Sequence, residues 1–320
     1  MRFIGRRLAL FLLTLWAALT INFIIPRLMP GDAALAMWSH IHNATPEQLA
    51  ALEAEFGTPN QNPVLAYIGY LGNSLTLNFG VTVDQVPVMT KIMQGLPWTI
   101  GLVGVATVIA FALGTLLGIY GAWRRGSWTD NLLSPLLFMV TTLPIFFLGL
   151  VLLLIFGVTL HWFPLNHPYS SLPTLTFQSV VDIGYHAFLP GLTLVLAAAG
   201  GWIYTMRNNM VATLSEDYVR MARAKGLSSR RIMISYSARN AILPNLTGFA
   251  MTMGFILGGS ILVEYIYSYQ GLGYLFYQGT SSRDLPLQQA LFLFYTVAVL
   301  VFVLLADVLT AWLDPRTRTA

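Results

Sequence analysis

Long uncharged stretches alternate with short polar segments along this chain of 320 residues. A helix needs about 20 mostly apolar residues to cross the hydrocarbon core of a bilayer. Six gaps between charged residues are long enough, and they predict spans at about residues 8–27, 97–121, 132–157, 187–206, 243–263 and 286–310. A β-barrel would show short alternating segments instead. The pattern predicts an all-α polytopic membrane protein whose residues 1–320 form a single transmembrane domain.

Composition supports this prediction, because 56% of the residues are hydrophobic and only 9% are charged. A soluble globular chain carries about 25% charged residues. A surface so poor in charge must largely face lipid. The chain has no cysteine, which excludes a disulfide, a thiolate nucleophile and a cysteine-based metal site.

The first apolar run also resembles a secretory signal, because Arg2, Arg6 and Arg7 precede it and Ala34-Leu35-Ala36 offers a cleavage-like site. The run is longer than the 7–15 residues of the apolar region of a signal peptide, and Pro30-Gly31-Asp32 intervenes before that site. We expect a retained helix, with a cleaved signal as the alternative.

Basic residues between the predicted spans fall mostly on one side of the membrane. That side holds 14 of the 17, namely Arg2, Arg6, Arg7, Arg124, Arg125, Arg207, Arg220, Arg223, Lys225, Arg230, Arg231, Arg239, Arg316 and Arg318. The other side holds Arg27, Lys91 and Arg283. Six spans and the positive-inside rule therefore predict that the N- and C-termini are both cytoplasmic.

Two loops between the spans are long enough to carry structure of their own. The external loop 28–96 contains a helix start at Thr45-Pro46-Glu47-Gln48, with Pro at the first helical position. Leu49, Leu52, Ala54 and Phe56 could follow on one short helix. A loosely ordered loop and a docking or gating element for an external partner both remain open.

The cytoplasmic loop 207–241 predicts two helices. Ser215 would cap the first, Glu216 and Asp217 would lie in its first turn, and Gly226 would end it just after Lys225. The second would start at Ser228 or Ser229 and run toward Ala241, with Pro244 at the entry to the fifth span. One interpretation of this basic loop is that it contacts anionic lipid. Nucleic-acid binding is disfavoured, because the patch is short and flanked by spans.

The order of residues in this loop resembles the EAA loop of ABC importer permeases, and more narrowly that of the dipeptide/oligopeptide permease family. The similar segments are Asp217-Tyr218-Val219-Arg220-Met221-Ala222-Arg223-Ala224-Lys225-Gly226-Leu227 and Arg239-Asn240-Ala241-Ile242-Leu243-Pro244. Only Ala222 and Gly226 keep the general letters, and Arg220 replaces a Glu, as is usual in the peptide branch. In that family the loop is a coupling helix that docks on a cytoplasmic ATPase. The resemblance thus assigns ATPase coupling to Asp217, Tyr218, Arg220, Ala222, Arg223, Ala224, Lys225, Gly226 and Leu227.

Further blocks along the chain are similar to the B-type permease of that family. They are Arg6-Arg7-Leu8, Leu28-Met29-Pro30-Gly31-Asp32, Asn78-Phe79-Gly80, Leu96-Pro97-Trp98-Thr99, Arg125-Gly126-Ser127-Trp128-Thr129-Asp130, Gly258-Gly259-Ser260 with Glu264, Gly271-Leu272-Gly273, Arg283-Asp284, and Asp307 with Leu313-Asp314-Pro315-Arg316. Departures from the family pattern are Gln270, Val303 and Thr310. The Leu-Pro-Trp-Thr block and the stretch around Gly271 resemble members associated with oligosaccharides, so peptide and oligosaccharide both stay open as substrates.

The resemblance implies a bacterial or archaeal plasma (inner) membrane and a set of partners. These are a homologous C-type permease, two cytoplasmic ATPase subunits or domains that bind ATP and Mg, and an extracytoplasmic substrate-binding protein. The sequence agrees that ATP is hydrolysed elsewhere, because neither Lys91 nor Lys225 follows the glycines of a phosphate-binding loop. The alternative is a secondary transporter or channel driven by an ion gradient, which usually needs acids within the spans. Asp307 is the candidate for such an acid, and a structural hydrogen bond is favoured as its role over a proton relay.

Other constellations predict no enzyme chemistry. His40 and His42 supply two ligands without a third nearby, and His161, His167 and His186 are expected in external loops, so no metal site is predicted. Neither His-Glu-x-x-His nor Gly-x-Ser-x-Gly occurs. Gly101, Gly104, Gly114 and Gly118 are expected to let helices pack closely. The aromatics Trp16, Trp98, Trp123, Trp128 and Trp202 are expected at membrane interfaces or in packing, although one could stack on a sugar. The sequence does not predict which residues line a substrate pathway.

Overall fold

The computed structural model describes residues 2–28, 38, 45–46, 62–128, 131–132, 134–254 and 260–313. These residues are almost wholly helical and form no strand beyond an isolated bridge between Val81 and Pro87. The all-α prediction is confirmed for them. The possible helix after Thr45, the Ala34-Leu35-Ala36 site, His40, His42 and the segment after Leu313 lie outside the described residues, apart from Thr45 and Pro46.

In the described part of the chain, four helical segments are long and apolar enough to cross a membrane: Gly5–Leu28, Val88–Trp123, Phe177–Leu214 and Leu285–Val308. They belong to α1 (Arg2–Leu28), to the run of α5 (Val88–Thr99), π-helical η1 (Ile100–Gly104) and α6 (Val105–Trp123), to α9 (Phe177–Leu214), and to α15 (Leu285–Leu313). They correspond to the first, second, fourth and sixth predicted spans. The fourth is longer than predicted, because Thr176 caps α9 well before residue 187 and the helix continues through polar residues to Leu214.

The third and fifth predicted spans are built from shorter pieces. Helix α7 (Ser134–Thr142) ends before Pro144, and α8 (Ile145–Leu152) with π-helical η3 (Leu153–Thr159) follows it. Pro144 has extended backbone and cannot donate an N–H to a preceding turn, which explains the break. The described part of the fifth comprises α12 (Arg239–Gly254) and α13 (Ile261–Ile266), and residues 255–259 lie outside the described residues.

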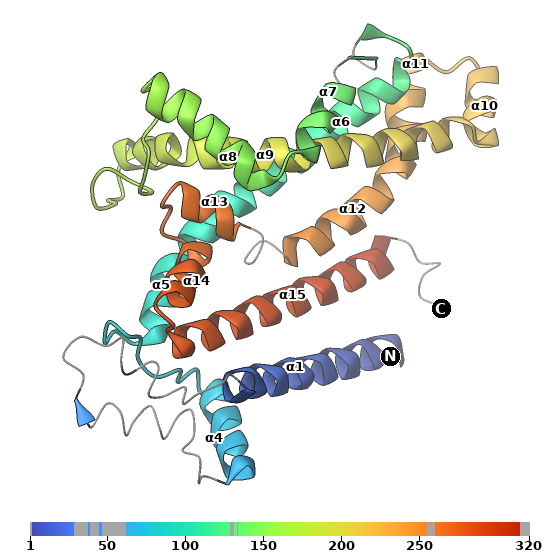
Figure 1. Cartoon of the computed structure of the whole chain (residues 1–320). Helices are drawn as coiled ribbons and strands as arrows, with labels where there is room; N and C mark the ends of the chain where they lie inside the picture. The colour runs from blue at the N-terminus through green and yellow to red at the C-terminus, as the bar shows by residue number, and fades with distance from the viewer. Residues whose placement is uncertain are drawn as a thin grey trace.

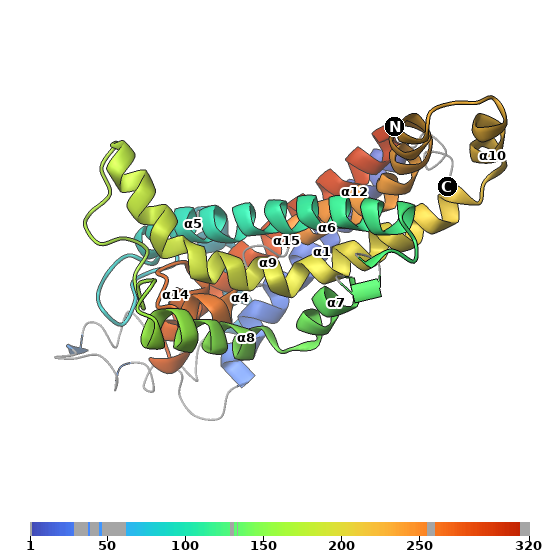
Figure 2. The same cartoon turned by 90° about the horizontal axis from the view of Figure 1, so that it is seen from above.

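The described helices place their connections at two opposite ends of the molecule (Figures 1 and 2). One end carries α10 (Asp217–Ala224), α11 (Ser229–Arg231), the start of α1 and the end of α15. The opposite end carries the start of α5 and the helix α14 (Leu272–Ser281), with α4 (Pro63–Leu75) nearby. The basic loop 207–241 is therefore separated from the loops that the charge pattern places on the other side.

Helices α6 and α9 pack closely because glycines face the contact. A Cβ at Gly118 would lie 2.8 Å from the carbonyl oxygen of Ile203, and one at Gly114 would lie 2.9 Å from that of Ala199. A side chain at either position would force the helices apart. By contrast, a Cβ at Gly101 or Gly104 would meet nothing within 4 Å. The predicted packing role is thus right for the first pair and wrong for the second, whose positions in η1 face no neighbouring helix.

Helices α1 and α15 are joined by polar contacts near both of their ends. Asn22 Nδ2 donates to the Gln289 carbonyl at 2.9 Å, and Gln289 Nε2 donates back to the Asn22 carbonyl at 3.0 Å. At the other end, Arg7 Nη1 lies 2.6 Å from Asp307 Oδ2. This ion pair gives the intramembrane acid a structural partner, as expected for Asp307.

We predict that Gly118→Ala destabilises the protein, because the added methyl group meets backbone atoms that can move only if α6 and α9 separate. Overpacking of this kind costs about 1–3 kcal/mol. Thermal unfolding of the purified protein in detergent should show a lower midpoint for this variant. Gly101→Ala, which adds the same methyl group to open space, serves as the control and should leave the midpoint unchanged or slightly higher. Equal midpoints for the two variants would contradict the packing role.

Candidate functional site

Helix α10 is a short amphipathic helix fixed by one apolar face. Val219 and Ala222 stand three residues apart and are 0% and 3% exposed. They form a cluster with Ile232, against which Trp123, Leu214, Leu227 and Tyr236 also pack. These neighbours come from the ends of α6 and α9 and from π-helical η4 (Ile232–Ala238). The helix is therefore held by three elements that lead into the spans.

The end of α10 is set by Gly226. Its φ is +74°, in the left-handed region, and its N–H donates to the Arg223 carbonyl at 2.9 Å. The Leu227 N–H donates to the Ala222 carbonyl at 3.3 Å, which satisfies a second terminal carbonyl. The prediction that Gly226 ends this helix is confirmed.

The predicted start of α10 is wrong by one residue. Ser215 ends α9 instead of capping α10, and its Oγ donates to the Ala212 carbonyl at 2.7 Å. Because α9 continues to Leu214, Glu216 becomes the residue that precedes α10 and Asp217 the first one in it. Both acids still lie at the positive end of the helix dipole, where they are stabilising.

The other face of α10 is open to solvent. Its exposed residues are Asp217, Tyr218, Arg220, Met221, Arg223, Ala224, Lys225 and Gly226. Met221 is 59% exposed and places an apolar side chain among the charged residues of this face. The nine residues assigned to coupling are thus brought together, with Ala222 buried and Leu227 half-buried beneath the exposed ones.

The loop continues without a break into the next span. The second predicted helix starts at Ser229, as expected, and runs through α11 and η4 into α12. Pro244 lies inside α12, so the helix begins before the proline. Asn240 Nδ2 donates to the Tyr218 hydroxyl at 2.9 Å and ties α10 directly to α12. A displacement of α10 would therefore act on α9 and α12 together.

At the opposite end of the molecule, a buried carboxylate joins sequence blocks that lie far apart in the chain. Glu264 is 0% exposed, and each of its oxygens accepts two hydrogen bonds. Oε1 accepts from Thr99 Oγ1 at 2.9 Å and Ser260 Oγ at 2.5 Å, while Oε2 accepts from the N–H groups of Gly273 and Tyr274 at 2.8 and 3.2 Å. Four donors fill the acceptor capacity of a carboxylate.

The glycines beside Glu264 allow this close approach. The Leu272 N–H donates to Thr99 Oγ1 at 2.7 Å, so the first residue of α14 is bonded to the last residue of α5. A Cβ at Gly271 would overlap both Glu264 and Thr99, and one at Gly273 would lie 2.7 Å from Ile261 Cα. The Leu-Pro-Trp-Thr and Gly-Leu-Gly blocks and Glu264 therefore form one junction. Sequence reasoning listed these blocks without predicting their contact.

Asp284 fixes the neighbouring loop in a similar way. Its Oδ2 accepts from the Val83 N–H at 2.9 Å and its Oδ1 from the Leu287 N–H at 3.2 Å. Burial raises the pKa of the Asp284 carboxyl. The two hydrogen bonds lower this pKa, but their effect is smaller than that of burial. The loop between α4 and α5 is thereby held to the start of α15.

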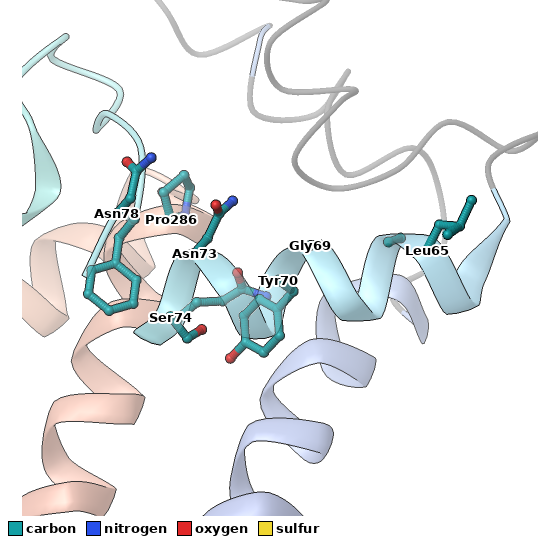
Figure 3. Close-up of a pocket in the computed structure, with 10 residues that line it drawn as sticks. Leu65, Gly69, Tyr70, Asn73, Ser74, Asn78 and Pro286 are labelled. Atoms are coloured by element: carbon teal, nitrogen blue, oxygen red, sulfur yellow. The ribbon is translucent and has the colours of Figure 1, made fainter. Parts of the chain in front are cut away.

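Several cavities lie at this end of the molecule, and two of them are described first. The smaller, of about 120 Å³, is bounded by α4 and the start of α15, with Asn73, Asn78 and Pro286 around it (Figure 3). It has room for a few waters and is too small for a solute. The larger, of about 520 Å³, lies between α5, Tyr169 and α14. Its volume falls within the range of ligand sites, which is roughly 300–1,000 Å³.

The three described histidines, His161, His167 and His186, belong to no candidate metal site. His186, expected in a loop, lies inside α9 and is buried, with Nδ1 2.9 Å from the Asp182 carbonyl oxygen. The loop prediction for it is wrong because α9 starts earlier than its apolar segment. Among the described residues, no group of three or more His, Asp or Glu side chains could hold a metal ion.

The comparisons with known proteins agree with this arrangement. Residues 114–319 match the family described as the binding-protein-dependent transport system inner membrane component. The oligopeptide transport system permease protein AppB of Bacillus subtilis is 34% identical over 300 residues, which are 92% of each chain. The dipeptide transport system permease protein DppB of Lactococcus lactis is 32% identical over 320 residues, 99% of each chain. A putative peptide transport system permease protein of Brucella abortus is 30% identical over 302 residues, 93% of each.

These similarities cover almost the whole chain and include the α10 loop and the Glu264 junction. A membrane-spanning permease of a transport system is the class that they define. The chain belongs to the family of binding-protein-dependent transport system inner membrane components. It is a multi-pass membrane protein and a translocation subunit, not an enzyme.

We predict that Gly226→Val loosens α10, because a β-branched residue is strained at a left-handed φ by about 1–2 kcal/mol. Hydrogen exchange of the amides in residues 217–227 should become roughly tenfold faster, as expected for a change of about 1.4 kcal/mol. Gly226→Asn is the matched control, because Asn adopts this conformation readily, and its exchange should stay near that of the wild type. A Cβ meets nothing within 4 Å at this position, so a steric effect would not explain a difference.

We also predict that Glu264→Ala destabilises the junction around Glu264, because it leaves four donors without their acceptor. Each unsatisfied donor costs about 1–3 kcal/mol. Trypsin should then cut the purified protein faster at Arg283, which follows α14. Glu216→Ala removes an exposed carboxylate that makes no capping hydrogen bond and should change nothing at this site. Unchanged proteolysis in Glu264→Ala would show that the carboxylate does not hold the junction.

Proposed function

We propose that this chain is the B-type permease subunit of an ABC importer that carries peptides into the cell at the expense of ATP. The family assignment supports an importer that works with a binding protein. The names of the relatives in Bacillus, Lactococcus and Brucella support a peptide solute over an oligosaccharide. The absence of a phosphate-binding loop in the sequence agrees with ATP hydrolysis on separate chains.

The observation that carries this proposal is the geometry of α10. Its apolar face is anchored on α6, α9 and η4, and its opposite face presents Met221 and basic side chains to solvent. A cytoplasmic ATPase that receives this face can move α10 as a rigid unit. Because α10 contacts both α9 and α12, its movement would shift two spans at once. ATP binding would thus favour one of two arrangements of the helices, as alternating access requires.

The proposed assembly contains two cytoplasmic ATPase subunits or domains that bind ATP and Mg, a homologous C-type permease, and an extracytoplasmic binding protein. The α10 end faces the cytoplasm, because basic residues concentrate there. The chain resides in the plasma membrane of a bacterium. Six crossings then include two made from shorter helices, which is tolerated where non-helical backbone is covered by protein. The partner permease and neighbouring helices would supply that cover.

The gradient-driven alternative has less support from the described residues. Asp307 is paired with Arg7, and all acceptor sites of Glu264 are filled by hydrogen bonds. Neither acid is arranged to bind and release an ion without breaking a structural contact.

The assembled complex tests the proposal. This chain is co-expressed with the permease, ATPase and binding-protein genes next to its own, and ATP hydrolysis is measured in lipid nanodiscs with short peptides and with neutral oligosaccharides. Stimulation by peptides is expected. Stimulation by oligosaccharides alone would correct the substrate class, and purification of the chain without any ATPase would contradict the coupling role.

We predict that Met221→Glu weakens ATPase binding at least about tenfold, equivalent to about 1.4 kcal/mol, because it places a charge at the centre of an apolar contact. Co-purification of the ATPase with the permease pair measures this directly. Leu175→Glu changes a fully exposed leucine in the loop before α9, which lies at the other end of the molecule, and is the control. Equal ATPase recovery in both variants would exclude the outward face of α10 as the docking surface.

A further inference from the structure

The cavity of about 520 Å³ lies at the end of the molecule opposite α10. It is bounded by α5 on one side, by α14 on the other, and by the loop that carries Tyr169. Under the proposed orientation it opens on the extracytoplasmic side. A solute released from an external binding protein would reach this region before it entered the membrane.

Amide and aromatic side chains dominate the lining. Three glutamines reach the cavity from different elements, namely Gln94 on α5, Gln270 before α14 and Gln278 within it. The side chains of Gln94 and Gln278 make no hydrogen bond to any described residue, and Gln270 Nε2 lies 3.2 Å from His167 Nδ1. None of the described residues that line the cavity is an Asp or Glu. A primary amide pairs a donor with an acceptor, and so does a peptide unit.

The aromatic rings at the cavity pack against one another. The rings of Trp98 and Tyr169 lie 5.2 Å apart, and Trp98 also meets Tyr269 edge-on at 6.2 Å. Such rings offer a large apolar area with little loss of conformational entropy on binding. They suit the varied side chains of a peptide, whereas the amides suit its constant backbone.

The two walls are held at a fixed separation by the Glu264 junction. Thr99 is the residue after Trp98, and the Gly273 and Tyr274 N–H groups that bind Glu264 start the helix that carries Gln278. At Gly95 the walls are so close that a Cβ would lie 2.9 Å from Leu275 Cδ1. The cavity is therefore preformed, which lowers the entropic cost of binding.

An ion pair stands at the edge of the cavity. Lys91 pairs with Asp84, and the two belong to an adjoining cavity of about 360 Å³ that shares Lys91 and Gln278 with the first. Asp284 lines the adjoining cavity as well. The amide-lined cavity is thus neutral except at one edge, where charges of both signs are available.

We propose that the amide-lined cavity binds the peptide solute at the entrance of the permease, with the glutamine amides facing peptide units and the aromatic rings facing side chains. This inference rests on the proposed function, because it takes the solute to be a peptide delivered from outside. It adds a solute-contacting site in this chain, formed by Gln94, Gln278, Trp98 and Tyr169 together.

Thiol labelling tests this site, because the chain has no cysteine of its own. Gln94→Cys and Gln278→Cys each introduce one thiol into the lining. Gln178→Cys, on an exposed residue near the start of α9 and outside the cavity, is the matched control. The complete complex in nanodiscs is treated with a fluorescent maleimide, and the label on this chain is measured after electrophoresis. The binding protein is added empty, with a mixture of alanine-containing tri- and tetrapeptides, or with maltotriose.

We expect the peptide mixture to slow labelling at both lining positions roughly tenfold when its concentration is about ten times Kd, and to leave the control unchanged. Equal protection by the empty binding protein would show that a partner covers the cavity and would overturn the proposal. Protection by maltotriose alone would overturn its peptide chemistry. Unchanged labelling while peptides still stimulate ATP hydrolysis would overturn the site and leave the proposed function intact.

A second measurement separates contact from shielding. The double variant Gln94→Ala with Gln278→Ala should raise the peptide concentration for half-maximal ATPase stimulation about tenfold, since it removes two amide hydrogen-bonding groups. Gln178→Ala is the control. An unchanged half-maximal concentration in the double variant would contradict direct binding by the amides.

Discussion

The close packing of α6 against α9 joins the two ends of this molecule. Helix α6 continues from α5, whose start forms one wall of the amide-lined cavity, and α9 ends at the loop that carries α10. Gly114 and Gly118 let the two helices approach until backbone atoms nearly touch. Without side chains between them, the pair has little freedom to slide or separate. The pair therefore forms a closely packed connection between the α10 loop and the wall of the cavity.

The junction around Glu264 plays the corresponding part at the end opposite α10. A buried carboxylate is costly unless hydrogen bonds replace its hydration. Here four donors from α5, α13 and α14 do so, and this requirement fixes how the three helices meet. The same contacts hold α14 at the wall of the cavity. The Glu264 junction attaches α14 to the spans through polar contacts, whereas α10 is attached to them through apolar contacts.

The apolar gaps in the sequence predicted four of the long helices well, because length and composition decide whether a helix can lie in lipid. The left-handed Gly226 was also predictable, since it follows a local rule. Features that depend on neighbours were not. Gly101 and Gly118 look alike in sequence but face different surroundings, and Ser215 ends one helix instead of starting the next. The bond between Thr99 and Glu264 spans 165 positions, so no local pattern reveals it. The cavity was missed for the same reason.

The central claim is that the outward face of α10 receives an ATPase. Cross-linking tests it most directly, because a cysteine at Met221 would be the only thiol in this chain. In the co-expressed complex, Met221→Cys should form a cross-link to the ATPase subunit with a short bis-maleimide, provided that the ATPase carries a cysteine in its docking cleft. The yield should change when ATP is added. An intact complex in which no cleft position cross-links to residue 221, with or without ATP, would contradict the account.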